Sequence, residues 1–171
     1  MAPKPGARAA ARRATRAGTD PVEPVSWTAF EAAAPDLAAE ARRLLRRGGE
    51  DAGLLATVRG DQPPRIHPVN VGVVDGRLYV FVLPSAKGTD LESDGRFALH
   101  SHQDPDAPSE LSIRGRATLV ADSFVRAAVA TSWPFEVDAS YRLFELRLTG
   151  IVIGRRPTAA DWPPRYSTWS P

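Results

Sequence analysis

The chain has 171 residues, of which 43% are hydrophobic, and it carries a formal net charge of +2 at pH 7 without any cysteine. This length is typical of one domain. The lack of cysteine excludes disulfides, thiolate nucleophiles and thiolate metal ligands, and it fits a reducing cytoplasm, the location we predict. No stretch approaches the ~20 apolar residues that a membrane-spanning helix needs, so no membrane association is predicted.

The positive charge is concentrated at the N-terminus. Residues 1–18 contain five basic residues and no acidic one, which leaves 17 basic and 20 acidic residues, a balance of −3, in the rest of the chain. That remainder has no basic field that would attract nucleic acid. Residues 1–25 lack apolar periodicity and are predicted to form a disordered tail. A polyanion-binding arm and a tail without function are both open alternatives.

Two helices are predicted at the start of the ordered region. Apolar residues recur there at helical spacing, and Pro35, a favourable first residue of a helix, divides the run. This pattern predicts helices over about 27–33 and 35–47, the second ended by Gly48-Gly49.

From residue 53 onward the pattern is that of β-strands. Apolar or alternating runs are separated by turn residues, and Asp75-Gly76 is a strong hairpin signal. The predicted strands are 53–59, 65–74, 77–83, 96–100, 111–119 and 144–153, the last with a bulge at Gly150. Short helices are predicted over 88–93 and 123–130. Residues 155–171 are rich in proline and aromatic residues and are predicted to be irregular.

Six strands joined largely by hairpins predict a mainly β fold with short flanking helices. The architecture we expect is a closed or nearly closed six-stranded antiparallel barrel. It would occupy residues 26–154, between the tail and the C-terminal extension 155–171.

Lys87 is the only lysine after Lys4. The other 20 of the 22 basic residues are arginine. It follows an apolar strand and lies in the sequence Ser85-Ala86-Lys87-Gly88. A hydroxyl, an ammonium group and backbone amides just past the end of a strand can hold a phosphate. The alternative is an ordinary solvated lysine on a loop.

The stretch from Leu55 to Lys87 is the most specific part of the sequence. It contains Leu-Ala-Thr-Val-Arg, a proline-bearing turn, Pro-Arg-Ile-His-Pro-Val, the Asp-Gly hairpin, an apolar strand and Ser-Ala-Lys. In this order it resembles the pyridoxamine 5′-phosphate oxidase-like, FMN-binding split-barrel family. The segments 90–100 and 113–117 are similar to the helix-to-strand segment and the next strand of that family. The resemblance covers about residues 27–154.

The resemblance implies a homodimer with a flavin at its interface. Carried onto this sequence, Arg65 and Lys87 would neutralise the FMN phosphate and Ser85 would hydrogen-bond it. The isoalloxazine ring would be lined by backbone groups of Ile66, His67, Pro68, Val69, Phe81 and Val82. Charge-assisted donors from several directions suit a phosphate dianion.

The predicted function is an FMN-dependent oxidoreductase that transfers a hydride to or from a small organic substrate. The flavin performs the chemistry, so no catalytic acid or base is assigned. The C-terminal Arg and His signature of the oxidase itself is absent, which argues against pyridoxamine phosphate as the substrate. The alternatives are a deazaflavin (coenzyme F-420) reductase, a non-catalytic flavin- or haem-binding protein, and a cofactor-free dimeric module.

Other residues have two interpretations. His67 is either a structural histidine or a cofactor contact. His100 and His102 share one strand face and could bind a metal with Asp104 or Asp106, but no third ligand has a firm spacing, and no metal is predicted. The segment Trp133-Pro134-Phe135 either covers the partner's cofactor or packs in the core.

Overall fold

The computed structural model describes residues 22–171, so most of the predicted tail lies outside the described residues. Helix α1 (Trp27–Ala33) occupies the predicted positions, and helix α2 (Pro35–Leu45) begins at the predicted residue. Ser26 caps α1 by accepting a hydrogen bond from the Ala29 N–H. Pro35 begins α2, where its missing N–H costs nothing.

The second helix ends two residues earlier than predicted. Arg46 and Arg47 form a two-residue strand, β1 (Arg46–Arg47), that pairs with Asp51 and Glu50. Gly48 and Gly49 have φ angles of 60° and 95°, so they form a hairpin turn rather than a helix cap. The opposite charges across this pair favour the hairpin.

The remaining elements follow the predicted order. The strands are β2 (Glu50–Thr57), β3 (Arg65–Asn70), β4 (Gly72–Val74), β5 (Arg77–Val82), β6 (Arg96–Ser101), β7 (Glu110–Leu119), β8 (Arg142–Arg155) and β9 (Arg165–Trp169). The other two helices are α3 (Ala86–Ser93) and α4 (Ser123–Ala130). Asp75 and Gly76 have φ angles of 47° and 70° and form the predicted hairpin turn between β4 and β5.

All strand pairs are antiparallel, and in residues 22–171 they form one nine-stranded sheet. The ladder runs from β3 through β2, β6, β7, β8 and β5 to β4. Because β3 and β4 are successive parts of the stretch 65–74, the path begins and ends on the same piece of chain. The mainly antiparallel β prediction is confirmed. The six-strand count holds only approximately, because the ladder is not closed and β1 and β9 extend it.

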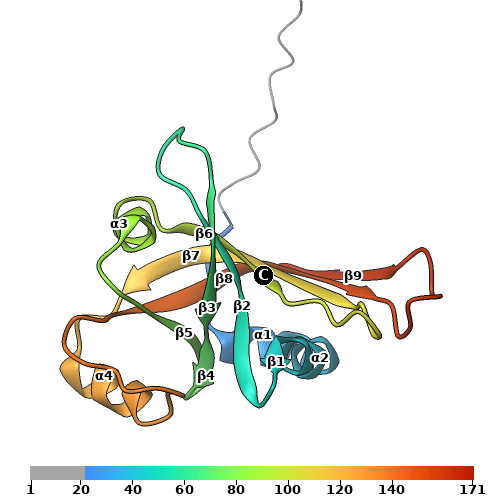
Figure 1. Ribbon diagram of the computed structural model, residues 1–171, viewed down its shortest axis with the longest axis horizontal. Helices are drawn as coiled ribbons and strands as arrows, with labels where there is room; N and C mark the ends of the chain where they lie inside the picture. Colours follow the sequence, from blue (N-terminus) through green and yellow to red (C-terminus); the bar gives the residue numbers. More distant parts are fainter. Residues whose placement is uncertain (1–21) are drawn as a thin grey trace, which may run out of the picture.

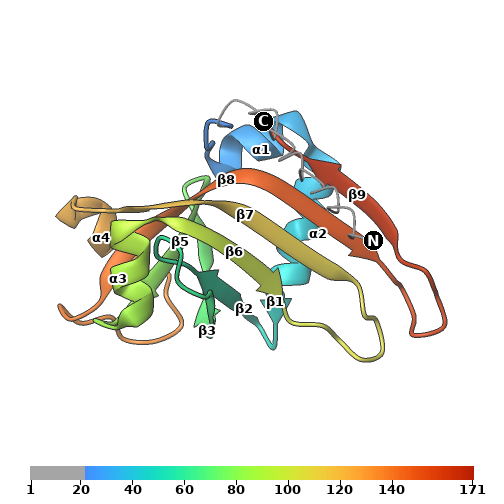
Figure 2. The same cartoon turned by 90° about the horizontal axis from the view of Figure 1, so that it is seen from above.

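The sheet curls around a core that is covered at its ends by helices. In Figure 2, β6, β7 and β8 lie side by side as one long curved surface, with α3 and α4 near one end and α2 toward the other. Figure 1 shows α1 and α2 packed together beside β2. The main cluster contains fully buried residues from the helices and from most strands, among them Trp27, Phe30, Leu55, Leu99, Ile113 and Phe144. A second cluster lies between β5, β8 and α4 and contains Tyr79, Phe81, Val129, Trp133 and Leu143.

Strand β9 corrects the prediction of an irregular C-terminus. Residues 165–169 pair with 151–155 of β8. The Trp169 ring packs against Phe30 of α1, with ring centroids 4.7 Å apart. The strand was missed because Arg-Tyr-Ser-Thr-Trp shows no apolar alternation, and its pairing depends on the edge that β8 offers.

The bulge predicted at Gly150 is confirmed. Arg114 of β7 pairs with Gly150 of β8, whereas the next residue, Gly115, pairs with Leu148. Thr149 is therefore the extra residue of the bulged strand.

Candidate cofactor site

Arg65 lies on the inner face of the sheet at the start of β3. In the cross-strand register Arg65 is opposite Thr57, and Thr57 is opposite Phe97 of β6. Because side chains alternate along a strand, His67 and Val69 share this face, and Val69 packs against the main core. Ile66 points the other way and is 66% exposed.

The partner of Arg65 is Asp90 of α3, which is completely buried. Arg65 Nη1 donates to Asp90 Oδ2 at 2.7 Å, and Thr57 Oγ1 donates to the same oxygen at 3.0 Å. Arg59 Nε lies 3.7 Å from Asp90 Oδ1. One carboxylate thus ties β2, β3 and the loop that follows β2 to α3.

Ser85 and Lys87 both lie at the N-terminus of α3. Ser85 is the N-cap, because its Oγ accepts from the Gly88 N–H at 3.4 Å and donates to the Leu83 carbonyl at 2.9 Å. Lys87 is the second residue of the helix. The prediction that Ser85 hydrogen-bonds a phosphate stays a prediction, since its hydroxyl has partners inside the protein.

Lys87 is partly buried, and in residues 22–171 its ammonium group forms no ion pair. Burial lowers its pKa below the usual 10.5. A cation at a helix N-terminus is also opposed by the helix dipole. These unfavourable contributions are relieved if an anion binds there, so the charge arrangement favours an anionic ligand.

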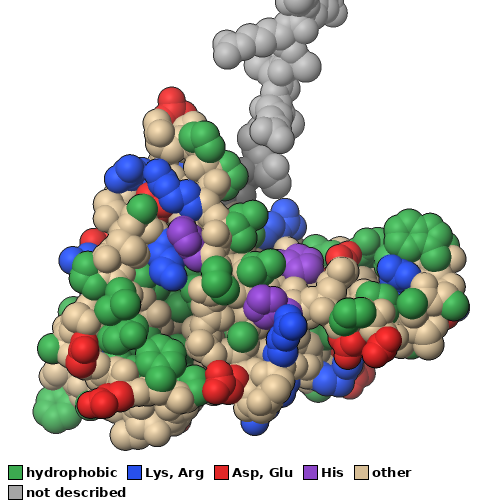
Figure 3. All heavy atoms as spheres, in the orientation of Figure 1, with side chains coloured by type: hydrophobic (Ala, Val, Ile, Leu, Met, Phe, Trp, Pro, Cys, Tyr) green, Lys and Arg blue, Asp and Glu red, His purple; other side chains and the backbone are tan. Residues whose placement is uncertain are grey.

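Basic side chains gather around this point. Figure 3 shows them between α3 and the loop that joins β2 to β3. Arg96 Nη2 donates to the Gly60 carbonyl at 2.9 Å, and the Gly60 N–H donates to Asp94 Oδ2 at 2.8 Å. Hydrogen bonds from Arg96 and from the Gly60 N–H hold the pKa of Asp94 well below its usual value. The loop that carries Arg59 is thereby fastened to the end of α3.

The predicted ring-lining segments border a split in the sheet. The β4–β5 ladder ends at the pair Gly72–Tyr79. Continued in the same register, it would place Phe81 opposite Asn70 and Val82 opposite Val69, but β3 turns away and pairs with β2 instead. Alternate backbone N–H and C=O groups of each segment therefore face the split without a strand partner in the described chain.

Neither a protein-family model nor a curated protein matches the chain, but solved structures do. A heme-binding protein from Mycobacterium smegmatis is 18% identical with a TM-score of 0.56, over 76% of this chain and 57% of that one. A putative pyridoxamine 5′-phosphate oxidase from Listeria innocua is 20% identical with a TM-score of 0.54, over 67% and 95%. A FAD-binding protein from Mesorhizobium loti is 18% identical with a TM-score of 0.50, over 67% and 91%.

This chain has the split-barrel fold. The resemblance found in the sequence is confirmed at the level of the fold. Sequence identities of 18–20% support a shared fold but not a shared function. The chain spans little more than half, 57%, of the length of the heme-binding protein.

The residues of this split barrel fit a flavin nucleotide. Lys87 and Arg65, which is held against α3 by Asp90, are cations that could pair with a phosphate. Backbone groups at the split can hydrogen-bond the edge of a planar ring that carries both carbonyl oxygens and N–H groups. His67 Nε2 is buried and has no hydrogen-bond partner within the described residues, as expected of a group that contacts a ligand.

Trp133 packs in the second hydrophobic cluster, in line with the core-packing interpretation of the segment 133–135. Its ring meets Phe81 of the same chain edge to face, with centroids 4.9 Å apart. It also lies over Gly72, where an added Cβ would come within 3.0 Å of the indole ring. Trp133 thus supports the segment of β5 that borders the split.

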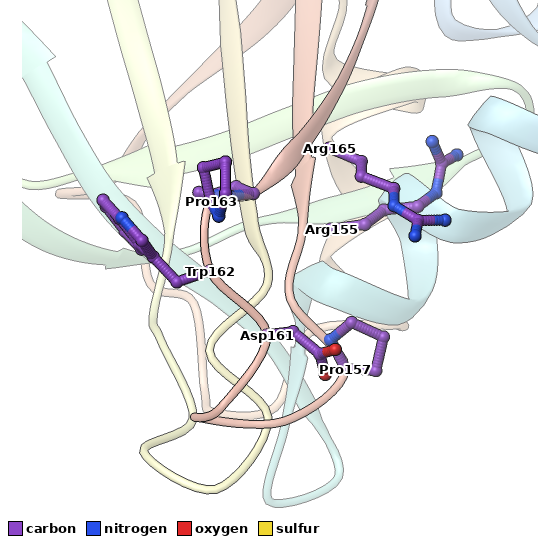
Figure 4. Close-up of a pocket in the computed structure, with 7 residues that line it drawn as sticks. Arg155, Pro157, Asp161, Trp162, Pro163 and Arg165 are labelled. Atoms are coloured by element: carbon purple, nitrogen blue, oxygen red, sulfur yellow. The ribbon is translucent and has the colours of Figure 1, made fainter.

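A separate cavity lies away from the predicted site residues. It measures about 470 Å³ and lies at the turn between β8 and β9, where Trp162 and Arg165 extend from opposite sides (Figure 4). Arg155 in its wall is paired with Glu40 of α2 through an Nε–Oε2 contact of 2.7 Å. None of the predicted site residues lines this cavity, and we place the candidate site at α3.

Two further observations concern the described residues only. No group of three or more potential metal ligands lies together in residues 22–171. No helix in this range is both long enough and apolar enough to cross a bilayer.

Proposed function

We propose that this split barrel binds FMN and acts as an FMN-dependent oxidoreductase on a small organic substrate. The observation that carries the proposal is Lys87, a partly buried lysine at the start of α3 without an ion pair in residues 22–171. Lys87 lies one helical turn before Asp90, the partner of Arg65. When bound, FMN would supply the capacity to accept and donate a hydride.

The protein's own residues would bind and orient the cofactor. Lys87 and the first amides of α3 would hold the phosphate, with Arg65 as the second cation. The strand edges at the split would fix the ring. His67 Nε2 would donate to or accept from the cofactor according to its tautomer. No residue is assigned as a catalytic acid or base.

Haem is the second candidate, because the structurally similar protein from Mycobacterium smegmatis is described as heme-binding. Coenzyme F-420 is a third. The absorbance spectrum of the protein as purified separates them, with bands expected at about 450 nm for FMN and about 420 nm for the deazaflavin, and an intense Soret band for haem. Colourless protein that takes up none of them on reconstitution would contradict the proposal.

We also propose that the protein is a homodimer. The outward face of β3, β2 and β6 is apolar for an exposed sheet surface. Two rows of directly paired residues cross these three strands on this face. One row consists of Pro68, Leu54 and His100, and the other consists of Ile66, Ala56 and Ala98. Ile66 is 66% exposed in the single chain. A second copy of the chain would cover this surface next to the cofactor site.

A further inference from the structure

Asp90 is an unusual residue for an eight-residue surface helix, because its side chain is completely buried. A buried carboxylate is unfavourable unless it is paired and hydrogen-bonded. Asp90 Oδ2 has two donors, Arg65 Nη1 at 2.7 Å and Thr57 Oγ1 at 3.0 Å. Within residues 22–171, Oδ1 has no hydrogen bond, and Arg59 Nε lies 3.7 Å from it.

Asp90 joins residues that are distant in the sequence. It lies three positions after Lys87, so both residues occupy neighbouring positions on one side of α3. Through its two oxygens it draws Arg65 from the start of β3 and Arg59 from the loop after β2 toward this helix. The Gly60 contacts with Asp94 and Arg96 fix the loop that follows Arg59.

The arginines are not fully used by this pairing. Only Nη1 of Arg65 hydrogen-bonds Asp90, and the Arg65 side chain is 33% exposed. Arg59 is 46% exposed. A guanidinium group carries five N–H donors, so both arginines retain donors for a ligand. Arg65 and Arg59 pair with the Asp90 carboxylate, and Lys87 lies three residues before Asp90 in α3. Three positive charges and one negative charge sum to +2, equal and opposite to the charge of a phosphate monoester dianion.

We propose that Asp90 is the positioning residue of the phosphate site, holding Arg65 and Arg59 beside Lys87 so that all three cations face one phosphate group. The inference rests on the proposed function and adds two residues, Asp90 and Arg59, to the predicted site. Asp90 itself does not contact the ligand. The guanidinium groups are held in place before the phosphate arrives, which reduces the entropy lost on binding.

The test compares FMN with riboflavin, which lacks the phosphate. Dissociation constants of both are measured for the wild type, Asp90→Asn and Arg59→Gln, with Arg43→Gln as the control. Arg43 is an arginine of α2 whose side chain is 65% exposed. Each of the first two variants is expected to lower the preference for FMN over riboflavin about tenfold, the scale of one charge-assisted hydrogen bond. The riboflavin constant and the control are expected to stay unchanged.

Each outcome has a distinct meaning. An unchanged FMN preference in folded Asp90→Asn overturns the inference, and so does an increase, because it would show that the carboxylate only repels the phosphate. If Asp90→Asn does not fold, Arg59→Gln decides, since it alters an exposed side chain. A wild type that binds neither flavin, or binds both equally, overturns the proposed function itself, whereas an FMN-selective wild type with unaffected variants overturns only the role of Asp90.

Discussion

Ser85 caps the helix in which Lys87 is the second residue. The Ser85 hydroxyl has an intramolecular donor and an intramolecular acceptor, the Gly88 N–H and the Leu83 carbonyl. Lys87 has no ion pair within residues 22–171 and has a lowered pKa. Ser85 and Lys87 are both predicted from the sequence to bind the FMN phosphate, but they are therefore expected to respond differently to substitution.

Lys87→Ala should weaken FMN binding by about 1.5–3 kcal/mol, because it removes a charged hydrogen bond to the phosphate. The fold should remain intact, since removing a partly desolvated cation from a helix N-terminus relieves an unfavourable charge. Fluorescence titration with FMN measures the effect. An unchanged FMN affinity in Lys87→Ala would remove Lys87 from the site.

Ser85→Ala, in contrast, should lower the free energy of unfolding by about 1 kcal/mol through loss of the helix cap.

The lowered pKa of Lys87 predicts a pH dependence of FMN binding. Burial favours the neutral amine, so in the ligand-free protein Lys87 loses its proton below pH 10.5. The protonated form is the one that binds phosphate, and FMN affinity should fall as pH rises through this lowered pKa. The folded state also binds this proton less tightly than the unfolded state, so this group makes the ligand-free protein more stable as pH rises through the same window.

Lys87→Arg is the matched variant for this pH series, because a guanidinium group remains charged throughout. FMN titrations between neutral and alkaline pH should show the loss of affinity in the wild type and a flatter profile in the arginine variant. Parallel profiles would mean that another group controls the pH dependence.

The sequence predicted the elements that are determined locally. Helix 123–130 and the turn at Asp75-Gly76 were placed correctly because caps, periodicity and turn residues are short-range signals. β1 and β9 were missed because each is short and forms only against the edge of another strand. Gly48-Gly49 was interpreted as a helix end because the same two glycines suit either a cap or a hairpin.

At the candidate site the sequence pointed to cations but not to what holds them. Arg65 and Lys87 were predicted, whereas Asp90, Thr57 and Arg59 were not. Asp90 lies 25 residues from Arg65 and 33 from Thr57, and in the sequence it resembles an ordinary solvated residue of a short helix. Its burial is a property of the assembled barrel. The only local signal was its position one helical turn after Lys87.

Ile66→Arg should prevent dimer formation. Ile66 lies on the outward apolar face of β3, and a charge at the centre of an apolar interface would be buried without a partner. Because the side chain is exposed in the single chain, the barrel itself should keep its stability. Light scattering after gel filtration should give half the mass of the wild type. Thr168→Arg, at an exposed position on β9, is the control. A wild type that is already monomeric would contradict the proposed dimer.

Gly115→Ala should destabilise the barrel, because the bulge brings two strands too close for a side chain. A Cβ on Gly115 would lie 1.8 Å from the Arg147 carbonyl oxygen and 3.0 Å from the Phe97 ring. The first contact is with backbone, so β8 would have to move, at a cost of about 1–3 kcal/mol or more. Gly150→Ala at the same bulge is the matched control, since its nearest atoms lie at 3.5 Å and 3.6 Å. Urea unfolding should show a lower midpoint for Gly115→Ala and a midpoint close to that of the wild type for Gly150→Ala. Equal midpoints in the two variants would show that the strands separate easily at the bulge.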